Sequence, residues 1–300
     1  MGHAGPGPPA YDRTVETRLI RGLGEVVRGF PCPRPGRRED PGLFGPDSIA
    51  WRINAETVLL LGGGRALLMQ VAHPMVAAGV ADHSHLTAEP FDRLWRTVDT
   101  ALTVVFGDSE QWRAAVRRVG GIHAHVRGER GAVPYSALDP NLLLWVHATL
   151  VDSSLVTYER FVRPLSPRQR ERYYLEMLRM GSAFGIPDAL QPPTYGDFRR
   201  YLERAIGGLG IGEECRQVAR AVLSPPAPLV LSPVGLLSGL AAVGMLPPRI
   251  RSGLGLRWDP GAERAFRAIA ATVRWTLPLL PDRVRRWPHA REAERRMGMP

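Results

Sequence analysis

DPNLLLWVHATLVDSSLVTYERF, residues 139–161, is the stretch that decides the fold, because it is a mostly apolar run that carries a single imidazole. Asp139 followed by Pro140 predicts a helix start: the carboxylate accepts free backbone N–H groups, and proline at the first helical position loses no hydrogen bond. At 3.6 residues per turn, His147 shares its helix face with Leu143, Leu144, Leu150, Val151 and Ser154. Its ring is therefore expected to lie in apolar surroundings.

A buried imidazole needs a partner, and the residues alone leave two interpretations of His147 open. It is either a core histidine bonded to a backbone carbonyl, or an axial ligand to a metal or haem iron. Helical spacing does not separate the two, because both place the ring inside the protein.

The composition predicts a globular protein with a substantial core. The chain has 300 residues, 44% of them hydrophobic, which suits one large domain or two small ones. Basic residues outnumber acidic ones by 39 to 29, giving a net charge of +10, and every basic residue is arginine. Since arginine alternates with acidic residues along most predicted helices, as on a solvated face, we expect no nucleic-acid partner.

Cysteine usage and the N-terminal residues favour a reducing, cytoplasmic setting. Cys32 and Cys215 stand in unrelated contexts and form no C-x-x-C pair, so neither a disulfide framework nor a thiolate metal site is predicted. Residues 1–10 are rich in glycine and proline and lack the apolar segment of a signal peptide. They are interpreted as a disordered leader before one helical domain, residues 11–300.

Two long stretches carry little charge. Residues 58–81 are interrupted by Arg65 and Pro74, and residues 221–248 contain no charge but include Pro225, Pro226, Pro228 and Pro233. Their proline-free parts are short for a membrane span, so buried helices are favoured. A charge-free apolar segment is still compatible with contact to a membrane surface.

Helical periodicity runs through most of the remaining chain. One helix is expected to start at Asp47–Ser48 and continue past Val58, with Gly62, Gly63 and Gly64 allowing close approach of another helix or a cofactor. No convincing period-two alternation is present, and residues 127–140 are expected to be a loop. The fold class predicted is all-α, a single large helical domain. Further helices are expected at 11–28, 91–105, 112–126, 168–180, 194–206, 212–223, 229–245 and 261–277.

Two histidine positions outside the central helix are candidate ligands. His73 precedes Pro74, which predicts a helix end or kink where the imidazole binds a metal or caps freed carbonyls. Asp82, His83 and His85 lie in a polar stretch, and His-x-His pairs occur in metal sites, although no third ligand follows at a characteristic spacing. These residues define a non-haem metalloenzyme as one functional alternative.

Arg93, Arg96 and Thr97 form a third candidate group. Their spacing of i, i+3 and i+4 places two guanidinium groups and a hydroxyl on one helix face among apolar neighbours. Surface arginines are the ordinary interpretation. A buried or cleft-lining face would instead let the guanidiniums bind an anion or polarise a bound oxygen species.

Four segments, taken in order, carry a family resemblance: WRINAETVLLLGGGRALLMQVAHPMVAAGVADHSHL, FDRLWRT, DPNLLLWVHATLVDS and GLLSGLAAVGMLPPRIR. Together they resemble the catalytic-domain family shared by the fungal ER-bound oxygenase MpaB and the bacterial rubber oxygenase, over residues 51–258. The resemblance implies an all-helical protein that encloses haem b and an apolar pocket and uses dioxygen on a hydrophobic, isoprenoid-like substrate.

The same resemblance assigns roles to individual residues. It implies that His147 is the proximal iron ligand and that Arg93, Arg96 and Thr97 form the distal motif, R-x-x-K-T in the rubber oxygenase. Arg96 stands in place of that lysine, and no glutamate in residues 71–82 matches the family's catalytic glutamate. These departures make a non-catalytic haem or lipid-binding protein the main alternative to an oxygenase.

Overall fold

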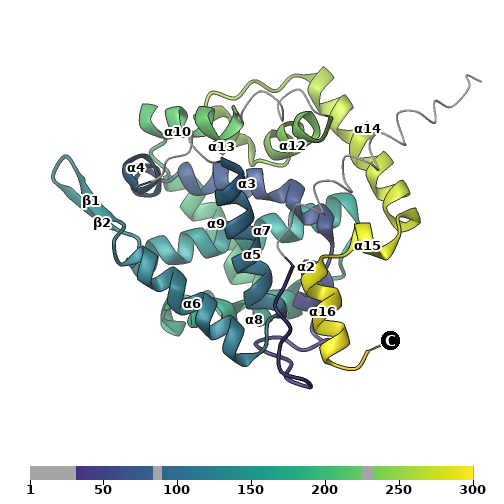
Figure 1. Ribbon diagram of the computed structural model, residues 1–300. Coiled ribbons are helices and arrows are strands. Elements are labelled where there is room, and N and C mark those ends of the chain that lie inside the picture. Colours follow the sequence, from purple (N-terminus) through teal and green to yellow (C-terminus); the bar gives the residue numbers. More distant parts are fainter. Residues whose placement is uncertain (1–31, 84–89, 225–232, 300) are drawn as a thin grey trace, which may run out of the picture.

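The computed structural model describes residues 32–83, 90–224 and 233–299, without the side chains of residues 90–95, 233 and 234. Within these ranges the fold is all-α, as predicted, with helices gathered around a central one (Figure 1). The predicted leader and the predicted helix at 11–28 lie outside the described residues. The longer helices are α3 (Leu61–Val71), α4 (Pro74–His83), α5 (Pro90–Phe106), α6 (Ser109–His123), α7 (Pro140–Phe161), α8 (Pro167–Ala183), α9 (Tyr195–Gly208), α10 (Glu213–Leu223), α12 (Pro233–Gly244), α14 (Pro260–Thr276) and α16 (Pro288–Arg296).

The central helix α7 is the one that the Asp139–Pro140 pair predicts. Asp139 accepts a hydrogen bond from the Asn141 backbone N–H at 2.7 Å, and Pro140 is the first helical residue. Most of its residues are buried, although Leu150, expected on the apolar face, is 44% exposed. Its surroundings include α3, α8 and α14, so the helix has apolar neighbours on several sides.

The glycines of α3 permit the close helix packing that the sequence predicts. A Cβ at Gly62 would overlap Thr157 Oγ1 on α7, and one at Gly64 would lie 2.9 Å from the Ala242 Cβ on α12. Gly63 faces open space, because a Cβ added there would meet no atom within 4 Å. The two apolar stretches thus pack on each other through α3 and α12, and none of the described helices has the length and hydropathy that crossing a bilayer requires.

A buried ion pair joins the same helices. Arg65 on α3 donates to the Asp152 carboxylate on α7 at 2.5 Å and to Ser153 Oγ at 2.6 Å. Its Nε donates to the Met245 carbonyl, just after α12, at 2.8 Å. Asp152 also accepts from Arg199 on α9 at 2.8 Å. Since both Arg65 and Asp152 are almost fully buried, these bonds satisfy charges that water does not reach.

The helix expected from Ser48 through Val58 is interrupted, which corrects the prediction. Ser48 caps α2 (Ile49–Asn54), but the chain then turns into the 3₁₀ helix η1 (Thr57–Leu60) before α3. The break is made by the C-terminal region: the Trp287 N–H donates to the Ala55 carbonyl at 3.0 Å, and Arg285 pairs with Glu56 at 2.6 Å. Local periodicity cannot reveal such partners, because they lie more than two hundred residues away.

The expected loop at 127–140 contains a β-hairpin instead. Strands β1 (Arg127–Arg130) and β2 (Val133–Ser136) pair antiparallel, with Gly131 at positive φ in the turn. The hairpin projects from the side of the helical body (Figure 1). Short elements that the periodicity also missed are α13 (Pro248–Gly253), α15 (Asp282–Arg285), η2 (Asp188–Leu190) and η3 (Leu277–Leu279). The prediction likewise lacked α16.

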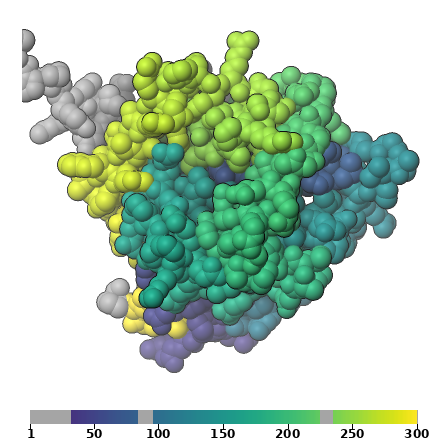
Figure 2. Space-filling model, turned by 180° about the vertical axis from the view of Figure 1, so that it is seen from behind, coloured from purple at the N-terminus to yellow at the C-terminus, as the bar shows by residue number. Residues whose placement is uncertain are grey.

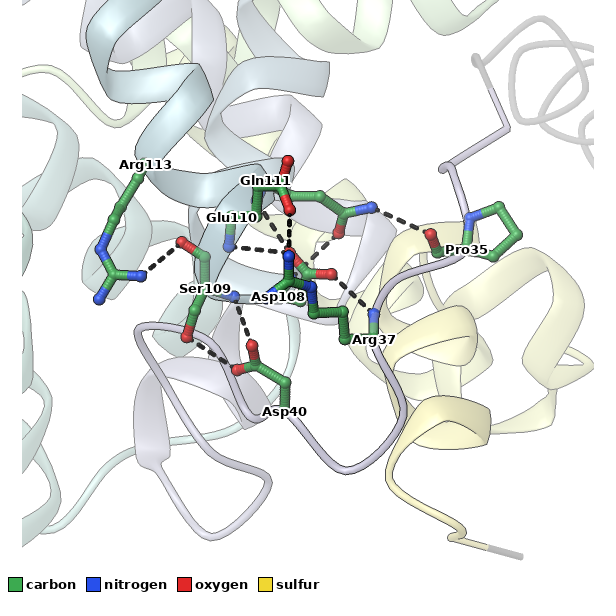
Figure 3. A network of polar contacts seen from close by, with 8 residues as sticks. All are labelled: Pro35, Arg37, Asp40, Asp108, Ser109, Glu110, Gln111 and Arg113. Atoms are coloured by element: carbon green, nitrogen blue, oxygen red, sulfur yellow. Dashed lines mark hydrogen bonds and ion pairs between the residues drawn. The ribbon is translucent and has the colours of Figure 1, made fainter.

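Residues 34–40, called the strap below, are hydrogen-bonded to the start of α6, as Figure 3 shows. Asp108 caps that helix through the Glu110 and Gln111 N–H groups and also accepts the Arg37 N–H at 2.7 Å. Asp40 accepts both the N–H and the hydroxyl of Ser109, at 3.0 and 2.9 Å. These bonds lower the pKa of Asp40, although its partial desolvation acts in the opposite direction. Carboxylates at a helix N-terminus are favoured by the free N–H groups and the helix dipole.

The glycines of α3 provide a matched pair of substitutions. Gly62→Ala should lower the free energy of unfolding by about 1–3 kcal/mol, because its methyl group overlaps Thr157 in a packed interface. Gly63→Ala should leave it unchanged or raise it by up to about 1 kcal/mol, since alanine favours helix and meets nothing there. Urea unfolding of both variants checks this, and equal effects would contradict the packing described.

Removing Asp152 tests the buried ion pair. Asp152→Ala should lower the free energy of unfolding by about 3–5 kcal/mol, because it leaves the Arg65 charge buried without its carboxylate. The control is Arg220→Ala, which breaks an exposed pair with Glu213 and should cost less than about 1 kcal/mol. Thermal and urea unfolding measure both, and a small loss in Asp152→Ala would show that Arg65 finds compensation elsewhere.

Candidate functional site

His147 lies on the face of α7 that packs against α8, and the structure confirms that it is buried. It is 8% exposed, and a Cβ at Gly181 of α8 would lie 3.3 Å from its Cδ2 atom. The same hypothetical Cβ would overlap Gln191 Oε1. The imidazole edge and the Gln191 amide therefore meet at the bare backbone of Gly181.

Burial keeps His147 neutral. Desolvation lowers the pKa of the imidazole from 6.5 to about 4, against the opposing effect of a hydrogen bond to the backbone of Met177. Nε2 is buried and has no hydrogen-bond partner among the described residues. The Met177 bond therefore belongs to Nδ1, which donates as N–H, and the lone pair of the neutral ring lies on Nε2. This tautomer is the one that binds metals through Nε2.

Gln191 completes this neighbourhood and was not predicted from the sequence. Its Nε2 donates to Ser182 Oγ at 2.9 Å and to the Leu178 carbonyl at 3.3 Å, while its buried Oε1 has no partner. It follows η2 in a proline-containing connection, PDALQPPT, that offers no helical periodicity. Two unsatisfied acceptors so close together are unusual in a native interior and call for a ligand or a water.

The donor chemistry of this site fits a haem iron, but the groups packed around His147 have to move before a porphyrin can bind there. A buried neutral imidazole with Nδ1 held by a carbonyl is what a proximal ligand needs. Nε2, however, is covered on the Gly181 side, where the Gln191 amide lies. Binding of a porphyrin through His147 therefore requires displacement of neighbouring groups. The Gln191 side chain is one such group, and its Oε1 atom has no hydrogen bond among the described residues that would oppose the movement.

Arg96 and Thr97 are exposed on α5, as the surface interpretation of this group expects. α5 packs mainly against α6, α16 and α2, and Arg118 of α6 bonds Thr100 at 3.4 Å. The side chain of Arg93 lies outside the described residues. The antiparallel pairing of α5 and α6 brings the end of α6, with the half-buried His123, toward the turn that holds Arg96 and Thr97.

His73 marks the predicted interruption between α3 and α4. Its Nδ1 accepts the Met75 N–H at 3.3 Å, and its ring centroid lies 6.3 Å from that of Trp145 on α7. Partial burial lowers the pKa of His73, and the Asp139 carboxylate opposes that shift. The ring thus accepts a free N–H at the start of α4, whereas the capping interpretation expected it to bond to freed carbonyls.

Asp82 and His83 each bond to residues of the β-hairpin. Asp82 pairs with Arg130 at 2.5 Å and accepts the Tyr135 hydroxyl, and His83 Nε2 lies 3.1 Å from the Arg127 carbonyl oxygen. His85 lies outside the described residues. Across the parts of the chain that are described, no three His, Cys, Asp or Glu side chains are placed to hold a metal ion.

A cavity of about 390 Å³ lies elsewhere, between α5, α6, α16 and the strap. In its wall the buried His289 bonds Asp99 at 2.9 Å, and Arg296 donates to the Asp40 and Phe106 carbonyls, both at 2.9 Å. His289 and Arg296 stand in a C-terminal helix that the periodicity did not single out. His147 is not among the residues that line this cavity.

Comparison with known proteins gives one family. Residues 51–275 match the family described as "ER-bound oxygenase mpaB/B'/Rubber oxygenase, catalytic domain". The chain is similar to the uncharacterized protein Mb2261 of Mycobacterium bovis and to the uncharacterized protein Rv2237 of Mycobacterium tuberculosis. Each is 32% identical over 228 residues, which cover 72% of this chain and 88% of the relative. No solved structure matches the chain.

The depressed pKa of His147 predicts a stability loss in acid. Between about pH 6.5 and 4 the unfolded chain binds a proton at this position and the folded protein does not, so stability falls as the pH drops through that window. The expected contribution is about 3 kcal/mol. Urea unfolding at pH 7 and 4.5 should show a smaller difference for His147→Gln than for the unmodified chain. The exposed His125→Gln should keep the full difference.

Proposed function

Because this chain belongs to the family of ER-bound oxygenase mpaB/B' and rubber oxygenase catalytic domains, we propose that it is a haem b-dependent oxygenase. The family is one of oxygenase catalytic domains, and the match spans residues 51–275. The proposed substrates are dioxygen and an apolar, isoprenoid-like molecule. The observation that carries the proposal is the buried, neutral imidazole of His147, whose Nε2 has no hydrogen-bond partner in the described part of the chain.

His147 is the residue proposed to hold the cofactor. Haem bound there would supply the binding and activation of dioxygen, which no protein side chain provides. The hydrogen bond to the Met177 backbone holds the ring orientation and keeps the lone pair on Nε2. The low pKa ensures that protonation does not compete for that lone pair near neutral pH.

Arg93, Arg96 and Thr97 are proposed to form the polar side of the reaction site. Arg96 and Thr97 are exposed on α5 and hence accessible to a ligand. A guanidinium keeps its proton at neutral pH, so Arg96 would stabilise negative charge or orient a polar group and would not act as a proton donor. The hydroxyl of Thr97 can both donate and accept a hydrogen bond.

The apolar helices α3 and α12 are proposed to contact the substrate. α3 packs on α7, α12 packs on α3, and α12 carries no charged residue. Apolar walls exclude water and favour a hydrocarbon chain through the hydrophobic effect. The closeness of α3 and α12 at Gly64 means that a substrate would enter beside this contact and not through it.

One alternative has an observation in its favour: a non-catalytic haem or lipid-binding protein of the same fold. Exposed Arg96 and Thr97 are separated from the buried face of α7 that carries His147, so a complete catalytic arrangement requires movement. Oxygen consumption with a farnesyl-chain compound or a polyisoprene emulsion separates the two, since a binder changes its spectrum without turnover.

The cofactor proposal is tested by absorbance after expression with adequate haem supply. The unmodified chain should show a Soret band, and His147→Gly should lose it and regain it when imidazole is added. His125→Gly, an exposed control on the segment after α6, should keep the band. A chain without a Soret band, or a His147→Gly variant with an unchanged spectrum, contradicts the assignment.

A further inference from the structure

Three large apolar side chains are more exposed than any others among the described residues, and two of them are close in the chain. Trp275 is 82% exposed, Leu279 is 75% exposed and Leu236 is 63% exposed. A single exposed leucine is ordinary on a protein surface, but a group of large ones marks an interaction site.

Backbone geometry places Trp275 and Leu279 near each other. Trp275 lies at the end of α14, and Leu279 follows four residues later in η3, which continues directly from that helix. α12, which carries Leu236, packs beside α14, and a Cβ at Gly244 would lie 2.9 Å from the Phe266 ring. Figure 1 shows α14 at the outer edge with α12 on its inner side.

This patch is not an unfilled part of the core. Leu277 is 4% exposed, Ala270 3% and Phe266 1%, so α14 and η3 already bury an inward face. Trp275 and Leu279 are instead exposed, and Figure 2 shows that the yellow-green C-terminal segment lies at the surface. Exposed apolar side chains beside a filled core suit insertion into a fluid layer, which requires no shape-matched partner.

Two exposed arginines lie on the same C-terminal segment as the patch. Arg264 lies on the outer stripe of α14 that also carries Ala268, Ala271 and Trp275, and Arg283 follows Leu279 in α15. Both arginines are exposed, and no ion pair is found for either among the described residues. With the chain at net +10, this surface combines apolar anchors with a field that attracts anionic headgroups.

We propose that Trp275 and Leu279, with Arg264 and Arg283, form a docking surface for an anionic lipid bilayer. Tryptophan favours the membrane interface because its ring is apolar and its N–H is polar. Apolar anchors alone or basic residues alone give weak, reversible attachment, and the combination gives a stable one. The proposal is independent of haem, although a bilayer is also where an isoprenoid-like substrate would dissolve.

Flotation of the full chain with vesicles tests the proposal. Vesicles of phosphatidylcholine and phosphatidylglycerol, about two to one, should carry the protein with at least about tenfold higher affinity than phosphatidylcholine alone. The double variant Trp275→Ser/Leu279→Ser should reduce binding about tenfold or more. Arg264→Gln/Arg283→Gln should weaken it and flatten its salt dependence. Ile122→Ser, at a 59% exposed position on α6, should bind as the unmodified chain does.

Tryptophan quenching by brominated lipid gives a second readout. Trp275→Phe keeps the apolar anchor but removes the reporter, so bound vesicles should quench the unmodified chain and not this variant. No binding to either vesicle, or an equal loss in Ile122→Ser, overturns the proposal. So does self-association in light scattering that Trp275→Ser/Leu279→Ser abolishes, because the patch would then join two copies of the chain.

Discussion

The buried pair of Arg65 and Asp152 is the constraint on which the arrangement of the central helices depends. A guanidinium taken out of water must direct its N–H groups at acceptors in fixed positions, and here those acceptors come from α7 and from the residue after α12. Asp152 in turn holds Arg199 of α9. One pair therefore sets how α3, α7, α9 and α12 meet, while the glycines of α3 allow the distance.

The helix α7 buries two polar side chains in different ways. Asp152 pairs with two arginines. His147, five residues earlier, has a hydrogen bond to the backbone of Met177, and its burial lowers its pKa to about 4, so the ring is neutral. The first arrangement gives each guanidinium nitrogen of Arg65 and both carboxylate oxygens of Asp152 a partner, as a structural element needs. The second leaves one nitrogen lone pair unused, and an unused lone pair in a dry environment is what a metal ligand requires.

The two parts of the proposed reaction site differ in their exposure to solvent. His147 is enclosed against α8 and Gln191, while Arg96 and Thr97 stand at the surface of α5 beside α6. Family membership supports oxygenase chemistry for both. The geometry adds that a ligand on His147 has to displace the Gln191 neighbourhood, so occupancy of the site and the position of that side chain are coupled.

Local sequence determined the elements whose causes are local. The Asp139–Pro140 start of α7, the interruption at His73–Pro74 and the close approach at Gly62 all follow from neighbouring residues, and the structure confirms them. The all-α class follows equally from helical periodicity. That His147 would be buried was also readable, because its helix face is apolar.

Tertiary structure alone decided the rest, because each feature depends on residues far apart in the chain. The break after α2 is imposed by Arg285 and Trp287, and Asp82 is held by the hairpin it packs against. The tautomer of His147 is set by a carbonyl thirty residues later. The Gln191 side chain lies near the imidazole because Gly181, between them, has no side chain. Exposure of Arg96 and of Trp275 depends on which helices cover them, and no spacing within one helix contains that information.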